Sequence, residues 1–331
     1  MKSIISAVLF TAVAQAVPTN TKTTTEIGVN PIVFDGRIPP LFRAAKFDSY
    51  ATSPYNAEYV LGGKYWMLWR ITHISSSYTI ILTSVTSIEE PWSKVIQFPN
   101  IPDSLFDVPL NGKSLIVKIN NKSIFAPGGP QNAQTGFRRS ELLPGVNSGN
   151  DATNNGVTAH HFSIRTDPTR PLNYTHEYQP VFIETQDYSS HVWQLKTGTP
   201  FAESWPLADA KTLRLYSSST SSAPSELLNV PFTEDEWHNF AVESDWDNDL
   251  ITIYYSTGLS PLAKVVGPVS NDASGKGQFH IGLLKLPTGP AGINVVKEGY
   301  QSKRPNEGLT YGGIFIEDTS AGSVTLEPVS A

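Results

Sequence analysis

Short runs of β-branched and aromatic residues follow one another along most of this chain, separated by clusters of Gly, Pro, Asn, Asp and Ser. No long stretch has the period of an amphipathic helix, and no segment is repeated. The pattern predicts an all-β fold: a β-jelly-roll sandwich of two antiparallel sheets, one of them concave with a substrate groove on its exposed face. The clearest runs are SLIVKINNKSIF, AHHFSIRT, HEYQPVFIET, HVWQLKTG, TLRLYSSS, HNFAVESDW, LITIYYSTG, QFHIGLLKL and YGGIFIEDT.

One domain accounts for these runs. The chain has 331 residues with 24 Gly and 25 Pro, but no Pro/Gly-rich linker divides it, and a single sandwich can reach about 200–250 residues. We therefore predict one domain over residues 26–328, with a monomer as the default state. The net charge of −6 provides no basic surface, which argues against a nucleic-acid partner.

The N-terminus has the layout of a secretory signal peptide. Lys2 precedes an apolar run over residues 4–13, and Ala14-Gln15-Ala16 forms a small-x-small cleavage site. The run is too short to span a bilayer, so we expect a secreted, extracellular protein with no membrane partner. The predicted signal peptide is residues 1–16, and residues 17–25 are a polar, threonine-rich lead-in.

Two further features bear on the secretory route. Glycosylation sequons begin at Asn121 and at Asn173, which fits passage through that route. The chain contains no cysteine, so a secreted form would lack disulfides.

Residues 63–88 interrupt the pattern. The segment GKYWMLWRITHISSSYTIILTSVTSI has no acidic residue, and Arg70 and His73 make it a poor membrane span. One interpretation is an inserted loop or extra hairpin. The other is a retained intron that is absent from the real protein, because Gly-Lys-Tyr can be encoded by GGT-AAG-TAT, which contains a strong splice-donor sequence. The mature transcript distinguishes the two.

Two strands concentrate charge in a chain of which only 16% of residues are charged. In TGFRRSELLPG, side-chain alternation places Phe137, Arg139 and Glu141 on one face. In NYTHEYQPVF, alternation predicts one face with Glu177, Gln179 and Val181, and an opposite face with His176, Tyr178 and Phe182.

Paired carboxylates on such strands are what glycoside hydrolysis requires. One carboxyl with a raised pKa protonates the leaving oxygen, and the other activates water or attacks the sugar. Arg139 would keep its neighbour Glu141 ionised, whereas apolar burial would hold the other carboxyl neutral. The alternative interpretation is an ordinary ion pair between Arg and Glu, which contributes little.

Other chemistry has weaker support. His238 in WHNF and His280 in QFHIGLLK each lie inside an apolar strand, where a single His is typical of the core. The stretch SNDASGKGQ departs from a calcium-binding loop, so Asp272 is interpreted as a turn residue. No metal-binding spacing, nucleophile elbow or phosphate loop occurs, and no metal or organic cofactor is predicted.

Several ordered motifs resemble glycoside hydrolase family 131, a fungal family. They cover almost all of the chain outside residues 63–88. They are PIVFDGRIP, GFRRSELLP, RPLNYTHEYQ, WHNFAVESDW, LITIYYSTG, GQFHIGLLKLP and LTYGGIFIEDTS.

This resemblance implies a β-jelly roll and a secreted, broad-specificity β-glucanase acting on β-1,3-, β-1,6- and β-1,4-linked glucan. It also implies that Glu141 and Glu177 are the catalytic acid/base pair, and His238 is our choice for an accompanying catalytic histidine. Relatives often have cysteines near both termini, at places where this chain has Asn30 and Ser323.

The predicted substrate-binding residues are Arg139, Gln179, Tyr255 and His280. The aromatic residues proposed as platforms for sugar rings are Trp92, Trp193, Trp205 and Tyr255. Two alternatives remain open: a polysaccharide lyase on a similar jelly roll, for which the acidic net charge is unfavourable, and a non-catalytic glucan-binding lectin, which would need no carboxylate pair.

Overall fold

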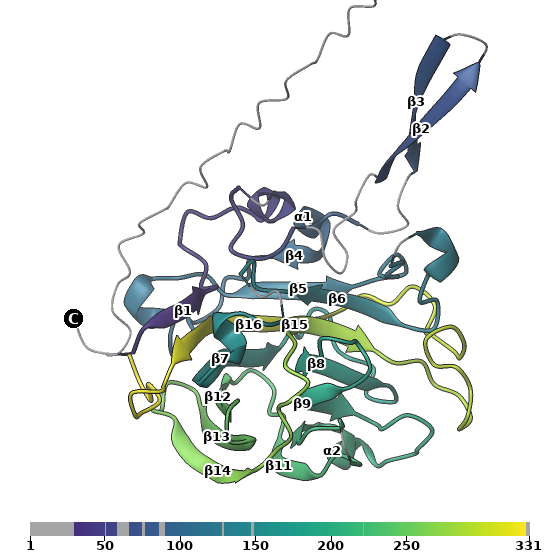
Figure 1. The fold of residues 1–331 in the computed structure, drawn as a ribbon. Helices are drawn as coiled ribbons and strands as arrows, with labels where there is room; N and C mark the ends of the chain where they lie inside the picture. The colour runs from purple at the N-terminus through teal and green to yellow at the C-terminus, as the bar shows by residue number, and fades with distance from the viewer. Residues whose placement is uncertain are drawn as a thin grey trace, which may run out of the picture.

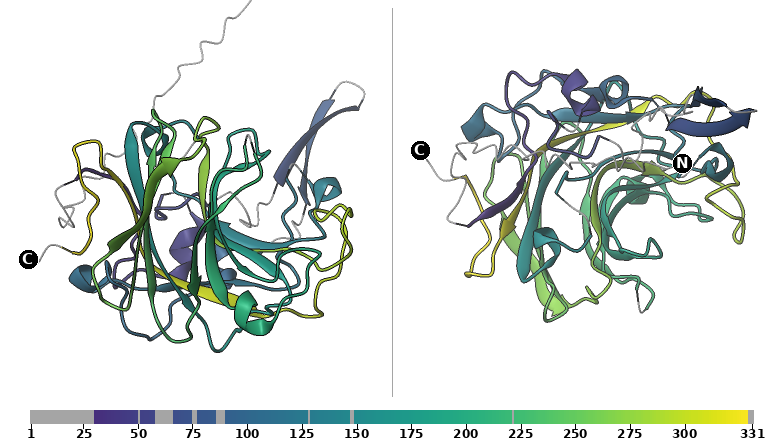
Figure 2. Two further views of the ribbon diagram at one scale, coloured as in Figure 1. Left: turned by 90° about the horizontal axis from the view of Figure 1, so that it is seen from below. Right: turned by 45° about the horizontal axis from the view of Figure 1, so that its top comes forward.

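A computed structural model describes residues 30–328 except 50, 58–65, 75–76, 86–89, 128, 147–148 and 221. The predicted signal peptide and lead-in, residues 1–25, lie outside the described residues. Two antiparallel sheets pack face to face, as the two orientations in Figure 2 show. The prediction of an all-β sandwich is therefore confirmed.

The larger sheet has eight strands in the order β14-β13-β12-β7-β16-β5-β4, with β1 paired to β16 (Figure 1). Its strands are β1 (Ile32–Asp35), β4 (Ile96–Gln97), β5 (Leu115–Ile119), β7 (Val157–Thr166), β12 (His238–Asp245), β13 (Leu250–Thr257), β14 (Ala263–Ser270) and β16 (Glu307–Asp318).

The smaller sheet has six strands in the order β11-β10-β9-β8-β15-β6. Its strands are β6 (Arg138–Leu142), β8 (Glu177–Glu184), β9 (His191–Gly198), β10 (Thr212–Tyr216), β11 (Glu226–Pro231) and β15 (Gln278–Lys285).

The main core fills the space between the sheets. Aromatic side chains from both sheets pack there: Phe162 stacks on Phe240 with ring centroids 5.1 Å apart, and Trp193 lies 6.4 Å from Phe162. Trp193 is 0% exposed and Trp92 is 1% exposed. These two predicted sugar platforms are therefore core residues, and they have no face for a sugar ring.

Residues 66–85 form a separate hairpin. Strands β2 (Trp66–Ile74) and β3 (Ser77–Val85) pair only with each other, and Figure 1 shows them projecting from the body at the upper right. The remaining short elements in the described part of the chain are helices α1 (Trp92–Val95) and α2 (Leu207–Ala210) and the 3-10 turns Ala44–Asp48, Val108–Leu110, Pro130–Asn132 and Ala152–Asn154.

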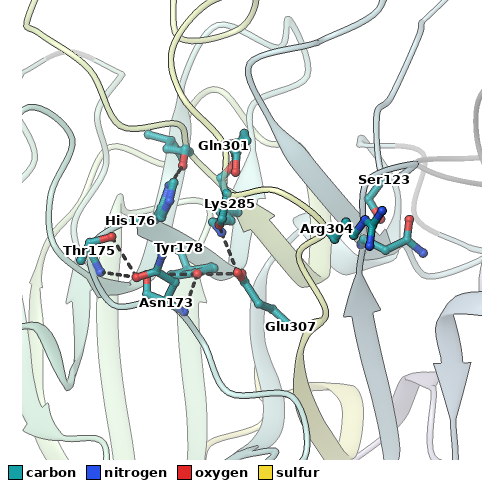
Figure 3. A network of polar contacts seen from close by, with 12 residues as sticks. Ser123, Asn173, Thr175, His176, Tyr178, Lys285, Gln301, Arg304 and Glu307 are labelled. Atoms are coloured by element: carbon teal, nitrogen blue, oxygen red, sulfur yellow. Dashed lines mark hydrogen bonds and ion pairs between the residues drawn. The ribbon is translucent and has the colours of Figure 1, made fainter.

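A buried polar network joins the two sheets at one end (Figure 3). Glu307 of β16 accepts hydrogen bonds from Lys285 of β15 and from the hydroxyl of Tyr178 of β8, both at 2.7 Å. Burial lowers the pKa of Lys285, while the charge of Glu307 opposes that change. The network fixes β8 against β15, the two strands that carry much of the site described next.

Candidate active site

The outer face of the six-stranded sheet, which points away from the main core, carries a row of polar side chains. Their inward-facing neighbours, such as Leu142, Val181 and Ile281, are fully buried in the core. Arg139 and Glu141 face outward from β6, as strand alternation predicts.

Glu141 is the most tightly held member of this row. Arg139 donates to its carboxylate from Nε to Oε1 at 2.8 Å and from Nη2 to Oε2 at 2.5 Å. Burial favours the neutral acid, but the charge of Arg139 and the hydrogen bonds from His280 and Arg139 lower the pKa of Glu141 to about 2. Glu141 is therefore ionised, and with 0% of its surface exposed it has no access to solvent.

Gly282 on β15 lets β6 approach this closely. It is the register partner of Glu141. A Cβ atom at position 282 would lie 2.0 Å from the carbonyl oxygen of Ser140 and 2.7 Å from the Cα atom of Glu141. Any larger residue there would push β6, and with it Glu141, away from β15.

His280 connects Glu141 to a second carboxylate. Its Nδ1 lies 2.9 Å from Oε2 of Glu141, and its Nε2 lies 3.4 Å from Oε2 of Glu184. Because Glu141 is an ionised acceptor, Nδ1 carries a proton and donates it. The imidazole also stacks on Phe182 at 4.5 Å, which fixes the plane of the ring.

A cavity of ≈ 420 Å³ opens at the Glu184 end of this row. Glu184 has 22% of its side chain exposed, whereas His280 has 2%, and Nε2 of His280 has no hydrogen-bond partner within the described structure. The lining residues are Phe125, Pro127, Gln134, Arg139, Glu184, Tyr188, Gln278 and His280. The cavity is thus bordered by His280 and Glu184, with Arg139 beside them.

Glu177 lies at the other end of β8 and makes different contacts. Its carboxylate is bound by Lys196 Nζ at 2.9 Å, by Gln179 Nε2 at 3.1 Å and by the backbone amide of Phe201 at 3.0 Å. Burial would raise its pKa, yet the charge and hydrogen bond of Lys196 and the other donors lower it. The neutral second carboxyl that the sequence predicts is therefore not found at Glu177.

His238 and Tyr255 do not join these residues. They belong to β12 and β13 of the eight-stranded sheet, and Nδ1 of His238 lies 2.8 Å from the Tyr255 hydroxyl. Both pack on the inner side of that sheet, where His238 contacts Phe232 and Tyr255 contacts Phe240. The structure gathers Arg139, Glu141 and His280 from the predicted set, and leaves His238 and Tyr255 on the other sheet.

Sequence reasoning missed Glu184 because regular alternation fails in β8. The register shifts between Tyr178 and Val181, so Val181 enters the core and Phe182 faces outward. The predicted faces of Val181 and Phe182 are therefore wrong. Pro180 was the available signal, because proline within a strand is typical of a bulge.

The described part of the chain has neither a metal-binding cluster nor a membrane-spanning helix. Within the described residues, no group of three or more His, Cys, Asp or Glu side chains is placed to hold a metal ion. Asp272 instead accepts hydrogen bonds from the backbone amide and hydroxyl of Ser274, as in a turn. None of the helices in the described ranges is long and apolar enough to cross a membrane.

Two solved structures share this fold over most of its length. A family 131 β-glucanase catalytic domain from Podospora anserina is 22% identical, with a TM-score of 0.60 over 90% of this chain and 98% of that one. The catalytic domain of a family 131 protein from Coprinopsis cinerea is also 22% identical, with a TM-score of 0.56 over 89% and 97%. No curated protein matches the sequence.

The sequence itself matches the family described as the glycoside hydrolase 131 catalytic N-terminal domain over residues 32–322. This match spans both sheets and every residue of the candidate site. The chain therefore belongs to glycoside hydrolase family 131.

Proposed function

We propose that this chain is a secreted β-glucanase whose proton-transferring groups are Glu184 and His280, with Glu141 orienting His280. The observation that carries the proposal is the contact of one imidazole with two carboxylates at the wall of a ≈ 420 Å³ cavity. Family membership supplies the reaction class, hydrolysis of a glycosidic bond. Secretion rests on the N-terminal sequence, and β-1,3-, β-1,6- and β-1,4-linked glucans are the substrates that the family resemblance suggests.

The two residues at the cavity lie close enough to pass a proton between them. Nδ1 of His280 donates to Glu141, which leaves Nε2 facing Oε2 of Glu184 at 3.4 Å. A proton carried by either atom lies beside the cavity and can be transferred to a bound sugar.

During hydrolysis the proton is given to the leaving oxygen, and a proton from the attacking water replaces it. As the bond between the anomeric carbon and the leaving oxygen breaks, that oxygen takes a proton from one of the two groups. The other group removes a proton from the water that adds to the anomeric carbon. Glu141 stays ionised throughout and stabilises the positive charge that His280 acquires, as the carboxylate does in other Asp–His pairs.

Arg139 and Glu177 receive other roles in this proposal. Arg139 neutralises Glu141 and presents its edge to the cavity. Glu177 is replaced as the second carboxylate by Glu184, because its oxygens are bound by three donors and it does not line the cavity. We assign Glu177 the role of holding the backbone at Phe201 against the end of β8.

The test compares single substitutions in the secreted chain. Reducing-end release from laminarin, a β-1,6-glucan and a mixed-linkage β-glucan is measured for the wild type and for Glu184→Gln, His280→Asn, Glu141→Gln and Glu177→Gln. We expect kcat to fall by about a hundredfold or more in the first three variants, the range typical of a lost acid or base. Glu177→Gln should keep kcat within about tenfold, and thermal unfolding checks that each variant is folded.

Each contrary result has a definite meaning. A Glu177→Gln variant as inactive as Glu141→Gln, beside an active Glu184→Gln, would restore the pair that the sequence predicts. Products with the ultraviolet absorbance of an unsaturated sugar would indicate a lyase. Glucan binding without product, in a folded wild type, would indicate a lectin.

A further inference from the structure

Trp205 lies over Arg214 of β10, three strands from His280 in the six-stranded sheet. Its indole ring lies over the guanidinium of Arg214, with Cζ 4.4 Å from the ring centroid. Arg214 is 0% exposed, and its Nη2 donates to the carbonyl oxygen of Gly198. These contacts fix the guanidinium on the sheet side of the indole. A guanidinium stacked on an indole is a favourable cation–π contact.

A second contact fixes the indole within its plane. Its Nε1 donates to Glu203 Oε2 at 2.6 Å. Trp205 remains partly exposed and belongs to none of the apolar clusters in the described structure. A large aromatic side chain that is anchored from below and from its edge, yet not buried, is what a stacking surface for a ligand requires.

The position of Trp205 relative to His280 follows from the strand pairing. His280 pairs with Phe182, Phe182 with Gln194, and Gln194 with Tyr216 of β10. Arg214 lies two residues before Tyr216 on the same strand and the same face. Three strand spacings of about 4.8 Å place Trp205 roughly 14 Å or more across the sheet from the His–Glu pair, a distance wider than one sugar ring.

Trp205 also lines a cavity of ≈ 390 Å³ at this end of the sandwich. The other residues around it include Tyr174, Thr175, Lys211 and Glu234. Lys211 is paired with Glu234 at 2.7 Å and lies 5.6 Å from the ring centroid of Tyr174. Two aromatic rings with a few fixed polar groups have the composition of a sugar-binding pocket.

We propose that Trp205 and this cavity form a distal subsite that binds a sugar unit of the same glucan chain whose cleaved bond lies at His280 and Glu184. The inference rests on the proposed glucanase function. It adds that efficient hydrolysis depends on the length of the glucan chain. A chain long enough to reach Trp205 gains the stacking contact, and a shorter one does not. Between the two ends, Lys196 and Tyr216 line the outer face, with Lys196 Nζ 5.3 Å from the Tyr216 ring centroid.

The experiment measures how the loss of Trp205 depends on substrate length. Trisaccharides and hexasaccharides derived from laminarin and from cellulose are hydrolysed by the wild type, Trp205→Ala and Trp205→Phe. We expect kcat/KM for the hexasaccharide to fall about tenfold in Trp205→Ala, as one aromatic stacking contact predicts, while the trisaccharide value changes less than about twofold. Trp205→Phe, which keeps an aromatic face, should retain most of the hexasaccharide rate.

Two controls separate this proposal from the proposed function. Leu259→Ala removes an exposed apolar side chain from the turn between β13 and β14 of the other sheet, and it should change kcat/KM for neither substrate. Calorimetric binding of the hexasaccharide is measured in Glu184→Gln with and without Trp205→Ala, so the subsite is tested even if the wild type hydrolyses nothing. The protein is made in a host without N-glycosylation, because Asn173 of the sequon lines the same cavity.

If Trp205→Ala lowers kcat/KM equally for the trisaccharide and the hexasaccharide, the distal subsite is overturned, since the variant would then have a general defect. Unchanged hexasaccharide binding and hydrolysis in Trp205→Ala would overturn it as well. Weaker hexasaccharide binding in that variant, without any hydrolysis by the wild type, would support the subsite and reject the glucanase.

Discussion

Arg139 holds Glu141 through two parallel hydrogen bonds, Nε to Oε1 at 2.8 Å and Nη2 to Oε2 at 2.5 Å. Both side chains are buried, so removal of either partner would leave an isolated charge away from water, which is costly. The pair therefore fixes Glu141 as a permanent anion beneath His280. Because the ion pair lowers the pKa of Glu141, it also makes the unfolding free energy of the domain depend on pH.

We predict that Glu141 contributes an acid-sensitive part of the stability. Its pKa is about 2 in the folded chain, against 4.5 for an ordinary Glu. Because the pKa is lower in the folded chain than in the unfolded chain, Glu141 stabilises the fold at pH values above the unfolded pKa. That stability is lost as the pH falls from about 4.5 through about 2. Between about pH 5 and about pH 3, the wild type should lose roughly 2 kcal/mol more unfolding free energy than Glu141→Gln.

Urea denaturation at the two pH values measures this difference. The control is Glu226→Gln, which changes an exposed Glu on β11 of the same sheet and should lose as much as the wild type. Parallel losses in the wild type and Glu141→Gln would contradict the lowered pKa.

The hairpin of β2 and β3 leads to a second prediction. Trp66 is the register partner of Val85, so the two ends of the hairpin lie side by side, and neither strand pairs with the two large sheets. Removing residues 63–88 breaks no strand pairing of the sandwich, so it should leave the sandwich intact, with an unfolding free energy within about 1 kcal/mol of the full chain. Failure of the shortened chain to fold would show that the segment is an integral part of the domain.

The transcript tests the origin of the same segment. We propose that it is a retained intron, since its apolar sequence interrupts the family motifs and its start can encode a splice donor. A mature message that lacks the corresponding bases would support the proposal. A message that keeps them, together with a stable shortened chain, would identify an inserted hairpin.

The sequence predicted the sandwich well because each strand carries its own signal. AHHFSIRT and HNFAVESDW have the composition of strands, and they become β7 and β12. Alternation also placed Arg139 and Glu141 on one face, since β6 is regular. Local patterns of this kind do not depend on the rest of the chain.

The site was harder to predict because it depends on the pairing between strands. His280 has the sequence context of a core residue, and only the pairing of β15 with β6 and β8 brings it between Glu141 and Glu184. His238 has a similar context, but its strand belongs to the other sheet. No periodicity within a single strand distinguishes these two histidines.

The last prediction concerns the two ends of the domain. Asn30 donates from Nδ2 to the carbonyl oxygen of Ser323 at 2.5 Å, so the positions where relatives often have cysteines are in contact here. The side chain at position 30 thus reaches the backbone at position 323, and a bridge across a loop of nearly the whole chain would restrict the unfolded state strongly. We expect Asn30→Cys combined with Ser323→Cys to raise the unfolding free energy by about 2–4 kcal/mol under oxidising conditions.

The single variants are the matched controls for this disulfide. Asn30→Cys alone should destabilise the domain slightly, because Asn30 also donates to Glu317 at 3.2 Å, while Glu317 keeps its bonds to His161 and Thr325. Thermal unfolding of the double variant with and without reductant isolates the contribution of the bridge. A double variant that oxidises fully but unfolds no later than its reduced form would contradict the prediction, and would show that strain in the folded state offsets the gain.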